Sequence, residues 1–150
     1  MTKIIFLALT IIAGGMQGQF DYRPTSIHDA WSQTVVTDGT DYTIEPENYR
    51  FQVTAHYTGL HRELDQKRVE LFRRWAKSLG HPPSYANICS HEVQVEDKGV
   101  KYWVALQDSL LDAFASEVGK DAAVSLQIIY VGAVEKERVF IVNGFQAIKT

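Results

Sequence analysis

Strict alternation of apolar and polar positions marks the middle of the chain as β-structure. Between Arg50 and Tyr57 every second residue is apolar, and the same period returns at residues 93–95 and 100–106. Since successive side chains of a strand point to opposite faces, this alternation predicts three strands with one face on a core. Lys98 and Gly99 separate the second run from the third, which predicts a hairpin.

Two further apolar runs near the C-terminus complete the predicted sheet. The run 124–131 alternates at first and then becomes apolar on both faces, and residues 139–142 are apolar on both faces from the start. Such runs are typical of strands that are covered on both sides. Gly144, just after the last run, marks an expected bulge or close approach.

Two segments have the helical period instead. Residues 66–79 follow Asp65, a good N-cap, and end before Gly80. Residues 109–118 form a shorter pattern of the same kind. The apolar stripe expected to be buried on the longer helix consists of Val69, Phe72, Ala76 and Leu79.

The order of these elements predicts a mainly β domain with two helices. It matches a five-stranded, partly open barrel like the oligonucleotide- and oligosaccharide-binding (OB) fold, with a helix inserted between strands 1 and 2. An open antiparallel α+β sheet with the helices on one face is the alternative. We expect residues 49–150 to form this domain and residues 19–48 an N-terminal arm, in which Asp38-Gly39 permits a hairpin.

The first residues have the layout of a secretory signal peptide. Lys3 precedes an apolar stretch from Ile4 to Ile12, and small residues follow it. The stretch is too short to cross a bilayer, which takes about 20 residues. We therefore expect residues 1–15 to be removed by a cut between positions 15 and 18. The remaining chain would be exported to the periplasm or the cell exterior, soluble and without a transmembrane segment.

Charge adds one candidate surface. The chain holds 15 basic and 18 acidic residues, and this diffuse excess of negative charge argues against a nucleic-acid partner. Basic residues nevertheless gather on one face of the long helix, which predicts a docking surface for another protein or an anionic ligand. The alternative is a solvated helix face on which Glu70 pairs with Arg74.

Motifs of catalytic and metal sites are missing from the sequence. It contains no nucleophile elbow, phosphate-binding loop, dinucleotide fingerprint or zinc-protease pair, and its histidines lack the usual spacing of ligands. We therefore predict no catalytic residue, no metal and no cofactor. Cys89, the single cysteine, is expected to be a buried thiol. An enzyme with a dispersed site of His81, Cys89 and His91 is the less favoured alternative.

These patterns together predict an exported, non-catalytic binding or protein-interaction module, such as an inhibitor or an immunity-type protein. A structural component of a cell-envelope assembly is the second hypothesis. Trp103 faces outward from a simple barrel, because it alternates with Tyr102 and Val104, and we expect the inserted helix to cover it. The predicted binding residues are Lys67, Arg73, Arg74, Lys77, Tyr85, His91 and Trp103.

Overall fold

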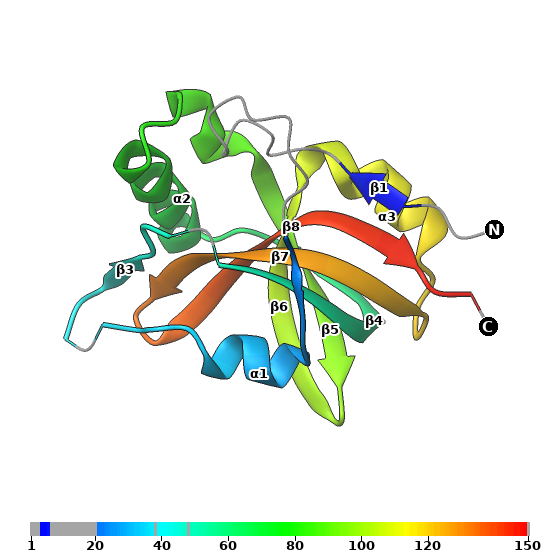
Figure 1. Ribbon diagram of the computed structural model, residues 1–150. Coiled ribbons are helices and arrows are strands. Elements are labelled where there is room, and N and C mark those ends of the chain that lie inside the picture. The colour runs from blue at the N-terminus through cyan, green and yellow to red at the C-terminus, as the bar shows by residue number, and fades with distance from the viewer. Residues whose placement is uncertain (1–3, 7–20, 38, 48, 150) are drawn as a thin grey trace.

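Five strands form the centre of the molecule (Figure 1). A computed structural model describes residues 4–6, 21–37, 39–47 and 49–149. The five strands are β4 (Arg50–Glu63), β5 (Cys89–Asp97), β6 (Val100–Gln107), β7 (Ala123–Val134) and β8 (Glu137–Ala147).

These strands close into a barrel because each of them pairs with two neighbours. β4 pairs with β5 and β7, β5 with β6, and β8 with both β6 and β7. Of these five contacts the one between β6 and β8 alone is parallel, and it joins Ala105 to Ile141 and Leu106 to Val142. The predicted OB-like barrel is confirmed, and the open sheet does not apply.

The alternating residues of the sequence line the inside of the barrel. Burying one valine, leucine, isoleucine or phenylalanine side chain stabilises a fold by about 1.5 to 3 kcal/mol. The barrel interior is therefore the main source of the protein's stability. Val100 is an exception, 50% exposed at the start of β6. The buried interior set includes Phe51, Val53, Ala55, Val93, Val95, Val104, Leu106, Val124, Leu126, Ile128, Tyr130, Phe140 and Val142.

Two short helices pack against this interior from opposite sides of the barrel (Figure 1). Phe114 of α3 (Leu111–Glu117), which follows the 3₁₀ turn η3 (Asp108–Leu110), meets Phe145 at 5.1 Å between ring centroids. Trp31 of α1 (Ile27–Ser32) stacks on Phe140 at 4.1 Å. α1 adds a third helix to the two predicted ones, and it begins where Ser26 Oγ accepts a hydrogen bond from the Asp29 amide.

The inserted helix α2 (Gln66–Ser78) packs on the outside of the barrel. Its buried residues Leu71, Phe72, Trp75 and Ala76 form a second core with Ile129, Val131 and Ile141, which explains why those strands are apolar on both faces. The 3₁₀ segment η2 (Pro83–Asn87) follows. The predicted stripe is wrong at Val69, which is 36% exposed. The helix is turned so that Arg68, a charged residue, faces inward instead.

Three short strands extend the sheet. β1 (Ile4–Phe6) runs antiparallel to β8, and β2 (Arg23–Pro24) runs parallel to β4. β3 (Tyr42–Ile44) pairs with β7, not with a strand of the arm. The hairpin that the sequence permits at Asp38-Gly39 includes residue 38, which lies outside the described residues. The signal peptide over residues 1–15 stays a prediction.

Gly132 lies at a bulge of β7, where β3 approaches closely. Its φ is +150°, and a Cβ added there would lie 2.0 Å from the carbonyl oxygen of Thr43. We expect Gly132→Ala to lower the free energy of unfolding by at least about 2 kcal/mol, measured by urea denaturation, because the two strands must separate. Gly119→Ala is the control, since an added Cβ there meets nothing within 4 Å. Equal unfolding midpoints for the two variants would contradict this close approach.

Candidate ligand-binding cleft

A cleft of about 600 Å³ opens beside β5 and β6. One wall comes from the end of β4 and the start of α2, and the opposite wall from the turn between β7 and β8. Trp31 of α1 adds to its lining. In the order of the barrel, the cleft is thus formed by strands 2 and 3 and by the connections between strands 1 and 2 and between strands 4 and 5.

The cleft carries charges of both signs with an excess of positive charge. This local excess has the opposite sign to the whole chain, whose formal net charge is −3. The basic side chains are Arg62, Lys67, Arg68, Lys101, Lys136 and Arg138, and the acidic ones are Asp65, Glu92, Glu135 and Glu137.

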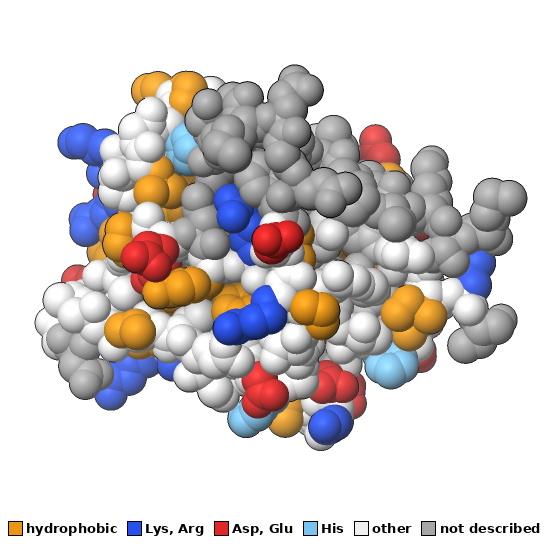
Figure 2. Space-filling view, in the orientation of Figure 1, with side chains coloured by type: hydrophobic (Ala, Val, Ile, Leu, Met, Phe, Trp, Pro, Cys, Tyr) orange, Lys and Arg blue, Asp and Glu red, His pale blue; other side chains and the backbone are white. Residues whose placement is uncertain are grey.

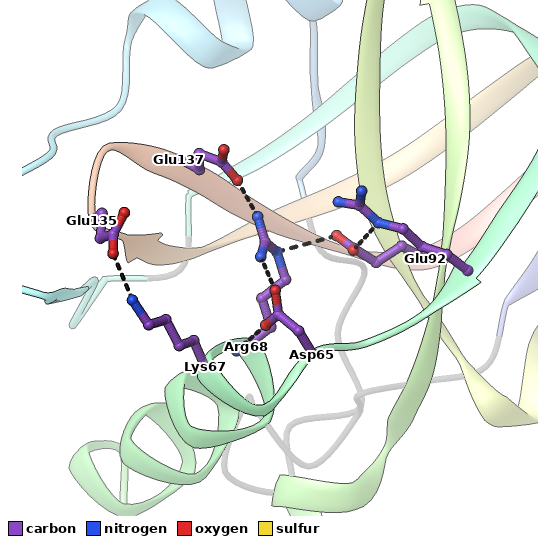
Figure 3. Close-up of polar contacts among 7 residues, drawn as sticks. Asp65, Lys67, Arg68, Glu92, Glu135 and Glu137 are labelled. Carbon is purple, nitrogen blue, oxygen red and sulfur yellow. Dashed lines mark hydrogen bonds and ion pairs between the residues drawn. The ribbon is translucent and has the colours of Figure 1, made fainter.

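Arg68 is the centre of the charged cluster (Figure 3), and only 9% of its side chain is exposed. Its Nη1 donates to Asp65 Oδ2 at 2.6 Å, its Nη2 pairs with Glu137, and its Nε lies 3.5 Å from Glu92 Oε2. Three carboxylates from three separate segments therefore surround one buried guanidinium.

Local helix chemistry puts Arg68 in this position. Asp65 caps the start of α2 by accepting the backbone N–H of Arg68 at 2.8 Å, and its second oxygen binds the side chain of the same residue. Burial by itself lowers the pKa of the Arg68 guanidinium, but Glu92, Asp65 and Glu137 outweigh burial and raise that pKa above its usual range. Arg68 thus stays charged inside the protein.

Glu92 of β5 connects the buried guanidinium to an exposed one. Only 3% of its side chain is exposed, and besides facing Arg68 it accepts a hydrogen bond from Arg62 Nε at 2.9 Å. A carboxylate so far from water is stable as an anion only while cations face it. Glu92 and the two arginines consequently form one unit at the floor of the cleft.

A second ion pair crosses the cleft near its rim. Lys67 Nζ donates to Glu135 Oε1 at 2.6 Å, and both side chains are more than half exposed. This hydrogen bond raises the pKa of the Lys67 ammonium and lowers that of the Glu135 carboxyl. Because water surrounds the pair, it contributes little to stability, and competing ions reach it readily.

Aromatic side chains form the remaining wall. Trp103 of β6 is partly exposed, and the guanidinium of Arg62 lies 4.0 Å from its ring centroid. The expectation that the inserted helix covers Trp103 is wrong, because α2 packs on β7 and β8 and leaves Arg62 to cover this ring. Trp31 stacks on Phe140 and meets Tyr102 at 4.8 Å, which holds its ring beside the cleft.

The structure brings only two of the predicted binding residues, Lys67 and Trp103, into the cleft. Arg73 and Arg74 pair instead with Glu70, at 2.7 and 2.9 Å, as expected for a solvated helix face. Figure 2 shows Lys and Arg side chains along the outside of α2, at the left edge of the view.

The other predicted binding residues lie apart from one another. Lys77 is exposed in the last turn of α2. Tyr85 is 7% exposed and stacks on His81 at 4.7 Å. His91 Nδ1 lies 2.8 Å from Ser90 Oγ and borders a separate hollow. The seven predicted residues therefore do not form one site.

The residues of the proposed Cys/His enzyme site are not arranged for catalysis. His81 packs between Trp75 and Tyr85, away from the hollow that Cys89 and His91 share. Burial, followed by the charge of Asp108, raises the pKa of the Cys89 thiol well above its usual range, whereas a nucleophilic cysteine needs a lowered pKa. Within the described residues, no three His, Cys, Asp or Glu side chains could hold a metal ion, and no helix has the length and apolar character to cross a membrane.

The buried position of Glu92 gives a test of the charged cluster. We expect Glu92→Gln to lower the free energy of unfolding by about 3 kcal/mol, because the change leaves the buried guanidinium of Arg68 short of one counter-charge. Denaturant titration at neutral pH measures the loss. Glu70→Gln, on the exposed face of α2, is the matched control and should cost much less. A loss at position 92 no larger than the loss at position 70 would mean that the cluster is solvated.

Comparison with known proteins finds a similar fold. No protein-family model matches the chain, and no curated protein matches it. Among solved structures, a chain in the crystal structure of the S. pombe Stn1-Ten1 complex is similar, with a TM-score of 0.52 and 12% identity over 87% of this chain and 81% of that chain. That OB-fold protein supports the assignment of the barrel.

This similarity corrects the function predicted from the sequence. The predicted function of an exported interaction module or envelope component is contradicted by this comparison, because the similar chain comes from the Stn1-Ten1 complex. The expectation of no nucleic-acid partner is contradicted by the same comparison. OB barrels bind oligonucleotides and oligosaccharides on strands 2 and 3 and on the loops after strands 1 and 4, which is the surface that carries the cleft. The predictions rested on the net charge of the chain and on missing motifs, and neither of these reveals a local binding surface on the barrel.

Proposed function

We propose that the chain binds single-stranded nucleic acid in the cleft beside β5 and β6. One observation carries the proposal: the cleft, with its excess of basic side chains and its aromatic wall, lies on strands 2 and 3 and on the two adjoining loops of an OB-like barrel. The similarity to the Stn1-Ten1 chain supports the fold on which this placement depends.

The side chains of the cleft match the two parts of a nucleotide. Lys101, Lys136 and Arg138 line it and can neutralise phosphates, as in other single-strand grooves. The ring of Trp103 supports the planar guanidinium of Arg62, which Glu92 holds over it. A base can stack on the outer side of this guanidinium. Stacking of this kind contributes about 1 to 3 kcal/mol per base.

A single strand fits these features better than a duplex does, because the bases of a duplex are already stacked on one another. The ion pairs within the cleft and the negative charge of the whole chain oppose binding. Binding should therefore be of modest affinity and should weaken as salt increases. An oligosaccharide, the other class of OB-barrel ligand, would bind with little dependence on salt.

Fluorescence anisotropy with a labelled short oligothymidine at low salt tests the proposal. We expect Trp103→Ala to weaken binding at least about fivefold, because it removes the ring that supports the Arg62 guanidinium for stacking on a base. We expect Lys101→Gln to reduce the slope of log affinity against log salt by about 0.7, the value for one phosphate contact on a single strand.

Arg73→Gln is the control for this experiment, since it removes a positive charge from the outer face of α2 and leaves the cleft intact. It should change affinity less than either cleft variant does. No binding at low salt, or equal weakening by all three variants, would contradict the proposal. Binding of an unlabelled oligosaccharide in place of the oligothymidine would assign the cleft to sugars.

A further inference from the structure

Two basic side chains of the proposed nucleic-acid site form ion pairs with carboxylates of the protein itself. We propose that Glu135 and Glu137, in and beside the turn between β7 and β8, hold Lys67 and Arg68 in place of a strand's phosphates, and that the bound strand displaces them. The inference rests on the proposed function and names the contacts that limit its affinity.

The two glutamates reach across the cleft from the turn between β7 and β8 to the start of α2 (Figure 3). Glu135 binds Lys67 with its carboxylate 60% exposed, and Glu137 binds Arg68 Nη2 with its own side chain 73% exposed. The partner Arg68 is by contrast 9% exposed. The exposed carboxylate of Glu137 therefore lies on the solvent side of a buried guanidinium.

A phosphate can take over both positions without leaving a cation unpaired. Carboxylate and phosphodiester oxygens are both anionic acceptors for ammonium and guanidinium N–H groups. Exchange at Arg68 Nη2 leaves its contacts with Asp65 and Glu92 in place. The released glutamates then regain full hydration, which their exposed positions allow.

Glu92 cannot be exchanged in this way. Its side chain is 3% exposed, and it binds Arg62 while facing Arg68. Removing this carboxylate would leave buried positive charge without a partner. The cleft thus contains one permanent carboxylate, which fixes the arginines, and two exposed ones that compete with the ligand.

Competition has a measurable consequence. Binding must break two ion pairs and place phosphates near two carboxylates, so both glutamates lower the affinity. Because the same contacts join the start of α2 to the β7–β8 turn, a bound strand also releases this connection across the cleft. Glutamine keeps the size of the side chain and removes the charge.

The test is oligothymidine binding by Glu135→Gln, Glu137→Gln and the double variant. We expect each single change to tighten binding about threefold and the pair about tenfold. Asp112→Asn on α3 makes the same change in net charge away from the cleft and should leave affinity nearly unchanged. Equal tightening by Asp112→Asn would overturn the inference, because it would show an effect of net charge alone.

A double-mutant cycle separates contact from charge. In a Lys67→Gln background, Glu135→Gln should tighten binding less than it does in the wild-type chain, since the ion pair is already gone and only the repulsion between carboxylate and phosphates remains. An undiminished gain in that background would overturn the exchange at this pair. Urea unfolding of each variant confirms that its fold is kept.

Failure of the inference can be told from failure of the proposed function. If the wild-type chain binds through Trp103 while the glutamine variants bind equally well, the inference alone is overturned. If neither the wild-type chain nor any variant binds, both are overturned. Binding by the double variant alone would overturn displacement, because it would show that a strand cannot replace the two carboxylates of the wild-type chain.

Discussion

The placement of the inserted helix and of the cleft depends on how a buried guanidinium is neutralised. Arg68 faces inward from α2, and Asp65, Glu92 and Glu137 approach it from the helix start, from β5 and from β8. The inward position of Arg68 goes with a rotation of α2 that leaves Val69 exposed and turns Leu71 and Phe72 onto the barrel. Through Arg68 the inserted helix contacts both β5 and β8, which border the cleft. The shape of the cleft therefore depends on these ion pairs as well as on the barrel.

The barrel itself is independent of this cluster. Its interior is apolar, and its strands close through backbone pairs, including the short parallel contact between β6 and β8. Placing the polar cluster outside the barrel separates stability from recognition, since exposed ion pairs in the cleft can exchange partners without opening the core. A fold built in this way can carry many different ligand sites on the same two strands and loops.

The sequence predicted what is local and missed what is distant. Alternation placed Val53, Val104 and Leu126 inside, because side-chain direction along a strand depends on neighbouring residues only. The cap at Asp65 and the irregularity near Gly144 were predictable for the same reason. Arg68 and Glu137 are 69 residues apart, and no periodicity relates them. The net charge of the chain likewise concealed a cleft with a local excess of the opposite sign.

The most direct measurement is a map of backbone amide shifts by ¹H–¹⁵N NMR during titration with a short oligothymidine. The account predicts that the shifts concentrate on β5 and β6 around Trp103, on the first turn of α2 and on the turn between β7 and β8. Shifts confined to the outer face of α2 around Arg73 and Lys77, or no shifts at low salt, would contradict it.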